Sequence, residues 1–139
     1  MTDFLRPAAD VESMPFWLAA REHRLVAQRC ADCGRLRFPA RPICPHCHSW
    51  QAEWSELSGE GRVRSWVVTH HVTHPAFVHR LPYTIVYVEL TDQPGLVMYG
   101  NLQPPTASVH LNMPVRAVFD DVTADVTLVQ WKADDSDGC

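Results

Sequence analysis

Residues 30–47 hold four of the five cysteines in the chain, as two Cys-x2-Cys pairs with ten residues between them. Two residues between cysteines let the chain curl so that both sulfurs point to one centre, and Zn²⁺ takes four such ligands tetrahedrally. Gly34 follows the first pair and suits the left-handed turn that ends such a knuckle, while His48 stands at the matching position after the second pair. The spacing predicts a zinc ribbon with four ligands, namely Cys30, Cys33, Cys44 and Cys47.

Four thiolate ligands leave no open coordination position, which is typical of a structural rather than a catalytic zinc site. Iron in the same cage and a pair of disulfides are the two alternatives. His46 and His48 lie beside the second pair but are surplus to the ligand set, and we expect them to face solvent. Because a ribbon of this size buries little core, zinc should supply much of its folding free energy.

The remaining sequence predicts a mainly β protein with one N-terminal helix. Residues 14–24 fit a short amphipathic helix with Ser13 as its cap and with Phe16 and Trp17 on its apolar face. Strands are expected around the cysteine pairs at 25–30, 35–39 and 52–57, and after the turn at 58–61 at 62–73, 83–90, 95–102, 115–121 and 126–131. Five strands joined by short turns and one longer connection predict an OB-type barrel, with a small sandwich as the alternative.

These patterns divide the chain into four parts: an N-terminal segment with the helix (1–24), a rubredoxin-like zinc ribbon (25–57), an OB-fold (58–132) and an acidic tail (133–139) that ends in a free surface thiol, Cys139. The composition, 46% hydrophobic and 20% charged, fits a soluble globular protein. No apolar run reaches the length of a membrane helix, and the N-terminus lacks the pattern of a signal peptide. We therefore expect a cytoplasmic protein with reduced thiols and no membrane contact.

The charge is unevenly spread along a chain of net charge −4. Residues 24–41 hold five arginines and one acid, Asp32. Arginine's planar fork suits phosphate and carboxylate partners, so Arg35, Arg37 and Arg41 are candidate residues for binding a partner or a phosphate, together with Phe38 between them. The alternative is that these arginines only keep the ribbon soluble.

Residues 69–80 carry four histidines: His70, His71, His74 and His79. A second metal site is disfavoured, because neighbours on a strand point to opposite faces and no carboxylate or cysteine lies in the segment. An exposed loop is the simpler interpretation. Its apolar Phe77, next to His74 and the rigid Pro75, makes a ligand- or partner-facing role the hypothesis for this loop.

The order of motifs resembles a known family, over about residues 14–131. The matching segments are PFW (15–17), QRCADCGRLRFPARPICPHCHS (28–49), SGEGRVRSW (58–66), HPAF (74–77), PYTIVYVEL (82–90) and MPVRAVFDDV (113–122). This series is similar to the acyl-CoA-associated zinc-ribbon and OB-fold family catalogued as DUF35. The chain departs from that pattern at Asn112, where glycine is common, and in its ending, which lacks a Phe-Arg-Pro segment. Asn tolerates the left-handed conformation, so we expect the turn at this position to be kept.

The resemblance implies a small accessory subunit that works beside a thiolase-like enzyme or an acyl-CoA hydratase or aldolase, with no catalytic residues of its own. It also implies a part in binding acyl-CoA, for which Arg35, Arg37 and Arg41 would suit the phosphates of CoA. Phe16 and Trp17 would then offer a docking face, with core packing as the equal alternative. A nucleic-acid-binding module is the second hypothesis, and the pI of about 6.0 counts against it. A stand-alone acyl-CoA hydrolase that uses a histidine of the 70–79 segment, such as His74, is the third.

Overall fold

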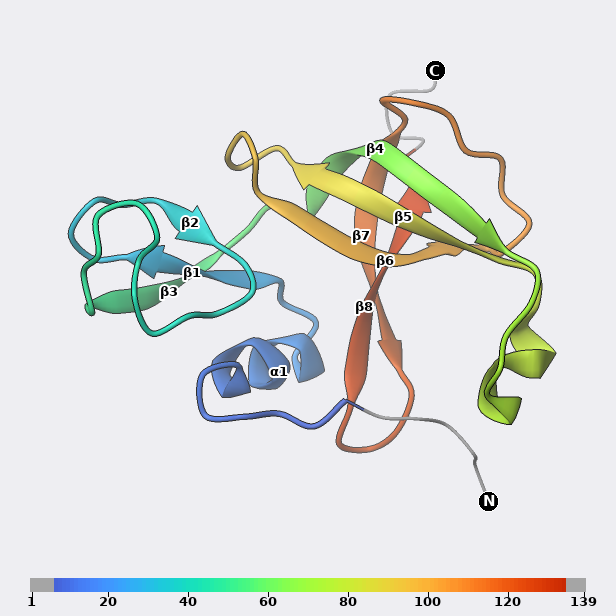
Figure 1. Cartoon of the computed structure of the whole chain (residues 1–139), viewed down its shortest axis with the longest axis horizontal. Coiled ribbons are helices and arrows are strands. Elements are labelled where there is room, and N and C mark those ends of the chain that lie inside the picture. The colour runs from blue at the N-terminus through green and yellow to red at the C-terminus, as the bar shows by residue number, and fades with distance from the viewer. Residues whose placement is uncertain (1–6, 135–139) are drawn as a thin grey trace.

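The computed structural model describes residues 7–134, so the first six residues, Cys139 and most of the acidic tail lie outside it. One helix precedes a three-stranded sheet, and a closed five-stranded barrel follows (Figure 1). The predicted class, mainly β with a ribbon and an OB-type barrel, is confirmed. The elements are α1 (Met14–Arg21), β1 (Val26–Cys30), β2 (Leu36–Arg37), β3 (Ala52–Glu56), β4 (Glu60–Thr69), the 3₁₀ helix η1 (Pro75–Arg80), β5 (Tyr83–Leu90), β6 (Val97–Gln103), β7 (Pro114–Asp121) and β8 (Thr127–Ala133).

Helix α1 is shorter than the sequence predicts. It ends at Arg21 because His23 adopts a left-handed conformation, with φ 61°. The backbone N–H of Arg24 then donates to the carbonyl of Ala19, which closes the helix in the manner of a Schellman motif. The expected side-chain cap is also wrong: the Ser13 hydroxyl accepts from the backbone N–H of Asp10 instead of capping the helix.

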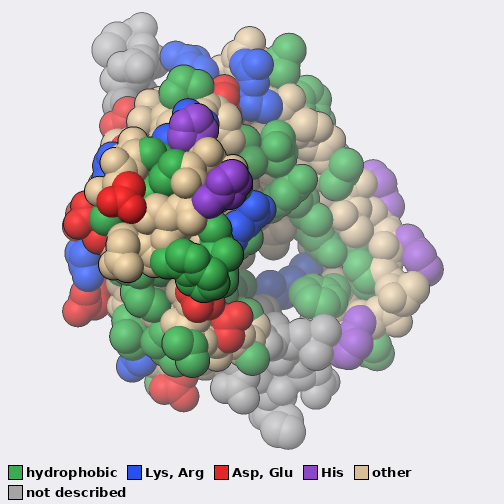
Figure 2. Space-filling view, turned by 60° about the vertical axis from the view of Figure 1, so that its left-hand side comes forward, with side chains coloured by type: hydrophobic (Ala, Val, Ile, Leu, Met, Phe, Trp, Pro, Cys, Tyr) green, Lys and Arg blue, Asp and Glu red, His purple; other side chains and the backbone are tan. Residues whose placement is uncertain are grey.

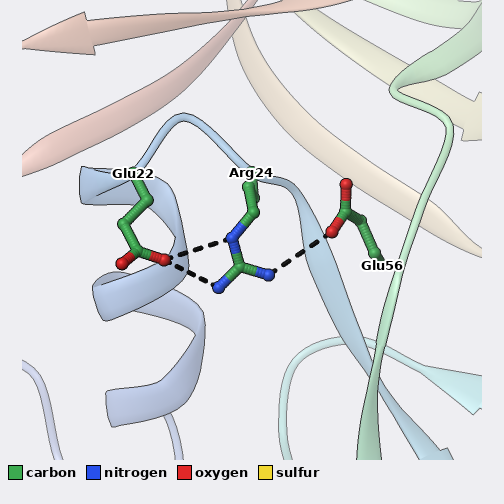
Figure 3. A network of polar contacts seen from close by, with 3 residues as sticks. All are labelled: Glu22, Arg24 and Glu56. Atoms are coloured by element: carbon green, nitrogen blue, oxygen red, sulfur yellow. Dashed lines mark hydrogen bonds and ion pairs between the residues drawn. The ribbon is translucent and has the colours of Figure 1, made fainter.

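The ribbon sheet has the order β2-β1-β3, with both pairings antiparallel. Strand β2 is only two residues long, shorter than the expected 35–39. Helix α1 lies beneath this sheet and beside the barrel (Figure 1). Arg24, just after the helix, links the end of α1 to the ribbon sheet. Its guanidinium donates to Glu22 at 2.8 and 3.1 Å and to Glu56 of β3 at 3.4 Å (Figure 3).

The barrel has the order β4-β5-β6-β8-β7 and closes through antiparallel pairing of β4 with β7. Strands β6 and β8 pair in parallel at Leu102 and Trp131. Strand β4 begins at Glu60 and ends at Thr69, so the expected strand 62–73 is displaced. Pairing with β7 stops at Arg62, and from Ser65 to Thr69 the strand pairs with β5 alone. This half of β4 therefore projects beyond the closed part of the barrel.

A single apolar core runs through the ribbon, the helix and the barrel. Phe16, Leu25 and Leu36 belong to the same cluster of buried side chains as Val86 and Trp131 of the barrel. In β5, alternate residues from Thr84 to Leu90 are buried, as the period of a strand with one core face requires. The two parts of the fold are thus packed together. Over residues 7–134, no helix is long and apolar enough to span a bilayer.

Candidate metal centre and adjoining surfaces

The four predicted ligands meet at one end of the ribbon. The Sγ atoms of Cys30, Cys33, Cys44 and Cys47 all lie within 4.8 Å of one another. Two of the separations are 3.5 Å, from Cys30 to Cys47, and 3.7 Å, from Cys33 to Cys44. Four sulfurs at these distances surround a single centre of the size that tetrahedral zinc needs. The predicted four-cysteine metal site is confirmed.

The two knuckles repeat the same backbone hydrogen bonds. In the first, Gly34 N donates to Cys30 O at 3.0 Å; in the second, His48 N donates to Cys44 O at 2.8 Å. Both turns require a left-handed residue, and Gly34 and His48 have φ of 79° and 67°. His48 therefore shapes the turn through its backbone, and its exposed side chain agrees with the prediction that it faces solvent.

The protonation of the thiols shows why the site needs a cation. The backbone N–H of Cys33 lowers the pKa of Cys30 to about 6, and that of Cys47 lowers the pKa of Cys44. The N–H of Ser49 also lowers the pKa of Cys47, but the neighbouring thiols and burial outweigh it and raise that pKa to about 12. Four sulfurs this close cannot all carry charge without a cation between them, and Zn²⁺ supplies it. With four thiolates bound, the ion has no open position for a substrate.

An apolar groove lies between the helix, the ribbon and the barrel. Its volume is about 480 Å³, and Phe16, Trp17 and Phe38 line it together with Tyr99 and Val129 of the barrel. Phe16 packs against Trp17 and against Phe38, with ring centroids 5.1 Å apart in both pairs. Figure 2 shows a hollow between the ribbon and the barrel with hydrophobic side chains along it. Three residues chosen from the sequence as partner or acyl contacts thus share one wall of this groove.

The three candidate arginines differ in exposure. Arg35 and Arg41 are exposed, whereas Arg37 is buried, with 7% of its surface accessible. All three line a smaller pocket of about 200 Å³, which Phe38 also lines. The alternative in which these arginines only keep the ribbon soluble does not fit Arg37, because a buried guanidinium contributes little to the surface. The strand register of Arg37 places its side chain inside the fold.

The histidine-rich stretch forms the predicted exposed loop only in part, over residues 70–74. After β4 ends, residues 75–80 fold into η1, and His74 caps it by accepting from the backbone N–H of Ala76 at 3.0 Å. The ring of His74 packs edge-on against Phe77, with centroids 6.1 Å apart. The four cysteines form the one cluster of candidate metal ligands within residues 7–134, so His70, His71 and His79 join no such group there.

Two contributors to these sites gave no signal in the sequence. Gln93, in the turn between β5 and β6, bonds to the ribbon backbone and lines the arginine pocket. Tyr99 of β6 is 69% exposed and forms the barrel side of the groove. A polar turn residue and an outward-facing strand residue look alike in any β protein, so only the tertiary arrangement reveals them.

A tetrathiolate zinc ribbon packed against a closed OB barrel defines the class of protein. Comparisons with known proteins agree. Residues 17–50 match the family described as "ChsH2, rubredoxin-like zinc ribbon domain", and residues 54–120 match "ChsH2, C-terminal OB-fold domain". The chain is 35% identical over 103 residues to a DUF35 domain-containing scaffold protein of Methanocaldococcus jannaschii, covering 73% of this chain and 71% of that protein. The chain belongs to the DUF35 family.

Three further proteins are similar to this chain. A protein of Thermomonospora curvata named "Probable enoyl-CoA hydratase alpha subunit" is 41% identical over 124 residues, which are 88% of this chain but 37% of that protein. The chain therefore spans little more than a third of that relative. A solved structure titled "Ltp2-ChsH2(DUF35) aldolase" superposes with a TM-score of 0.80 and 37% identity, covering 92% of this chain and 98% of the other. A DUF35 protein of Sulfolobus solfataricus, with 16% identity and a TM-score of 0.64, shares the fold.

Proposed function

We propose that this chain is a non-catalytic subunit that assembles with an acyl-CoA hydratase- or aldolase-type enzyme. The observation that carries the proposal is the match over almost the whole of both chains to the DUF35 chain of an aldolase complex. The relative named as a hydratase subunit supports the same enzyme class. A thiolase-like enzyme, which the sequence also implied, remains a second partner class for the same role.

The metal centre supports a structural rather than a catalytic part in such a complex. A zinc ion held by four thiolates cannot bind or polarise a substrate unless a ligand leaves. Cys30 and Cys44 are buried, and the knuckles are closed by backbone hydrogen bonds. The metal therefore fixes the ribbon, and the ribbon in turn positions Phe38 at the groove. Because this zinc site needs reduced thiols, we propose that the protein works in the cytoplasm.

The apolar groove gives the subunit a way to contribute to the partner's substrate. Its walls carry the aromatic rings of Trp17, Phe38 and Tyr99, and its volume of about 480 Å³ is in the range of small-molecule sites. We propose that the acyl part of a CoA thioester runs along this groove at the subunit boundary. Phe16, underneath, is buried and holds Trp17 and Phe38 in place.

The projecting half of β4 provides a surface for the partner itself. Trp66, Val67 and Val68 are 37%, 59% and 45% exposed, although they follow one another in a strand. Apolar side chains on both faces of an unpaired strand edge favour aggregation of an isolated subunit. Burial of this edge against a partner subunit would prevent it. Phe77 and His74 lie on the connection that follows this strand, so they belong to the same proposed contact region.

Reconstitution with a hydratase- or aldolase-type protein that co-purifies with this chain from its source cells tests the proposal. We expect the purified chain alone to turn over no acyl-CoA, and the partner to gain activity when the chain is added. The Cys33→Ser variant, which cannot complete the zinc site, should fail to give this gain. Turnover of acyl-CoA by the isolated chain, lost on His74→Ala, would contradict the non-catalytic role.

A further inference from the structure

Three arginines surround one small pocket between the ribbon and the barrel. The pocket has a volume of about 200 Å³, and its walls come from β2, the loop after it, Pro45 of the second knuckle and the turn that holds Gln93. Arg35 and Arg41 are exposed, and Arg37 lies beneath them. Three like charges on one pocket repel one another unless an anion lies between them.

Arg37 is the unusual member of this set. Its Nη2 donates to the backbone carbonyl of Arg41 at 2.9 Å, but its Nε and Nη1 are covered and have no hydrogen-bond partner in the described part of the chain. A buried guanidinium with two unused donors is unfavourable, because it has lost its water without gaining an acceptor. The loop around it is fixed, since the Gln28 side chain accepts from Arg41 N at 2.8 Å.

Within residues 7–134, no carboxylate forms an ion pair with the arginines of this pocket. Of the ion pairs among residues 7–134, which use Arg24, Arg64, Arg116 and His23 as cations, none includes Arg35, Arg37 or Arg41. Asp32, the one acid within this basic stretch, accepts from the Ser49 hydroxyl at the first knuckle instead. The three arginines therefore have no ion-pair partner in the part of the chain that the structure describes.

We propose that this pocket is a binding site for a phosphate-type oxyanion, with Arg37 as its buried cation and Arg35 and Arg41 at its opening. Guanidinium groups pair with phosphoryl oxygens through two parallel N–H donors, and three of them match a dianion. The volume holds a phosphoryl group. Because Arg37 has a single hydrogen bond, rotation of its guanidinium brings Nη1 toward the bound oxygens. The site does not depend on the proposed partner.

Calorimetric titration of the zinc-loaded chain with inorganic pyrophosphate, at fixed ionic strength, tests the proposal. We expect saturable one-to-one binding. Arg37→Met keeps the apolar stem and removes the charge, and it should weaken binding at least tenfold. The double variant Arg35→Ala/Arg41→Ala changes only exposed side chains, so it should fold and should also weaken binding. Arg21→Ala, at the exposed end of α1, is the matched control and should bind as the wild type does.

Three results would overturn the proposal. The first is no saturable heat in the wild type. The second is equal binding by the wild type and the double variant, which would indicate non-specific attraction. The third is undiminished pyrophosphate binding by Arg37→Met, which would remove the buried guanidinium from the site. Assembly with the partner is measured separately, by co-purification, so failure of the anion-site proposal leaves the proposed function standing.

Discussion

The carboxamide of Gln93 hydrogen-bonds to both backbone groups of Leu36. Leu36 N donates to Gln93 Oε1 at 2.8 Å, and Gln93 Nε2 donates to Leu36 O at 2.8 Å. The side chain thus takes the place of a further strand at the open edge of β2. Because Gln93 sits in the β5–β6 turn and Leu36 in the ribbon core, this pair fixes the ribbon to the barrel.

Replacement of Gln93 by Ala should therefore loosen the ribbon. It leaves the N–H and C=O of the buried Leu36 without partners, so we expect the free energy of unfolding to fall by about 1–3 kcal/mol. Denaturant unfolding of the zinc-loaded protein measures this change. Gln51→Ala is the control, because Gln51 is exposed and, in the described part of the chain, its hydrogen bonds use only backbone atoms: its carbonyl accepts from Ala31 N, and its N–H donates to the Ser49 hydroxyl. Equal unfolding midpoints for the two variants would contradict the role of Gln93.

Removal of zinc should unfold the ribbon before the barrel. Chelation removes the metal bonds that hold the two knuckles together, while the barrel keeps its closed strand pairing and Trp131 at its core. Hydrogen exchange should show loss of amide protection over 26–56 with β5 and β6 still protected. Cys33→Ser should reproduce this result, and Cys139→Ser, outside the ligand set, should not. Full protection of the ribbon after chelation would show that the metal is dispensable for its fold.

Asp121 should contribute to stability in a pH-dependent way. The Thr127 hydroxyl, and then His23, whose Nε2 lies 3.0 Å from both carboxylate oxygens, lower its pKa from the ordinary 3.8. Because the pKa of Asp121 is lower in the folded than in the unfolded state, its ionised carboxylate stabilises the fold at pH values above the unfolded pKa. This contribution is lost as the pH falls through the folded-state pKa. Asp121→Asn should be less stable than the wild type at pH 6, with a difference that shrinks below pH 3.8.

Parallel unfolding curves of the two proteins from pH 6 to pH 2.5 check this, since acid displacement of zinc affects both alike. The ring of His23 also stacks on Phe119, with centroids 5.2 Å apart. A stability difference that stays constant, or grows, as the pH falls would contradict the assigned role of the Asp121 carboxylate.

Trp17 should matter for binding rather than for folding. It lines the groove at the edge of the core, so Trp17→Ala should weaken the partner's use of long acyl-CoA substrates more than that of acetyl-CoA. Leu18→Ala is the matched control, because Leu18 is the next residue on α1, 49% exposed and absent from the groove. Equal effects of the two variants on the chain-length preference of the reconstituted complex would contradict the proposal that the acyl group runs along the groove.

The zinc site could be predicted from the sequence because its ligands are close in the chain. The Cys-x2-Cys spacing and the left-handed residues that follow it specify each knuckle locally, and Gly34 and His48 adopt the expected conformation. The same holds for Asn112, with φ 66°. The barrel was also predictable, since five β-rich segments are joined by short turns and one longer connection.

The errors arose where tertiary contacts decide the outcome. The end of β4 depends on where pairing with its neighbours stops, which the β-branched run 67–69 does not reveal. The burial of Arg37 follows from its position in a two-residue strand beneath a turn of the barrel. Arginine is usually exposed, so the sequence predicts exposed side chains for both Arg35 and Arg37. No local pattern distinguishes the two.

The central claim is that this chain is a subunit of an acyl-CoA hydratase- or aldolase-type complex. Native mass spectrometry of the tagged chain, purified from its source cells at low salt, tests it most directly. The account predicts a stoichiometric complex with a hydratase- or aldolase-type protein, and with zinc retained in the DUF35 chain. A chain that is recovered alone, or whose bound protein belongs to an unrelated enzyme class, would contradict it.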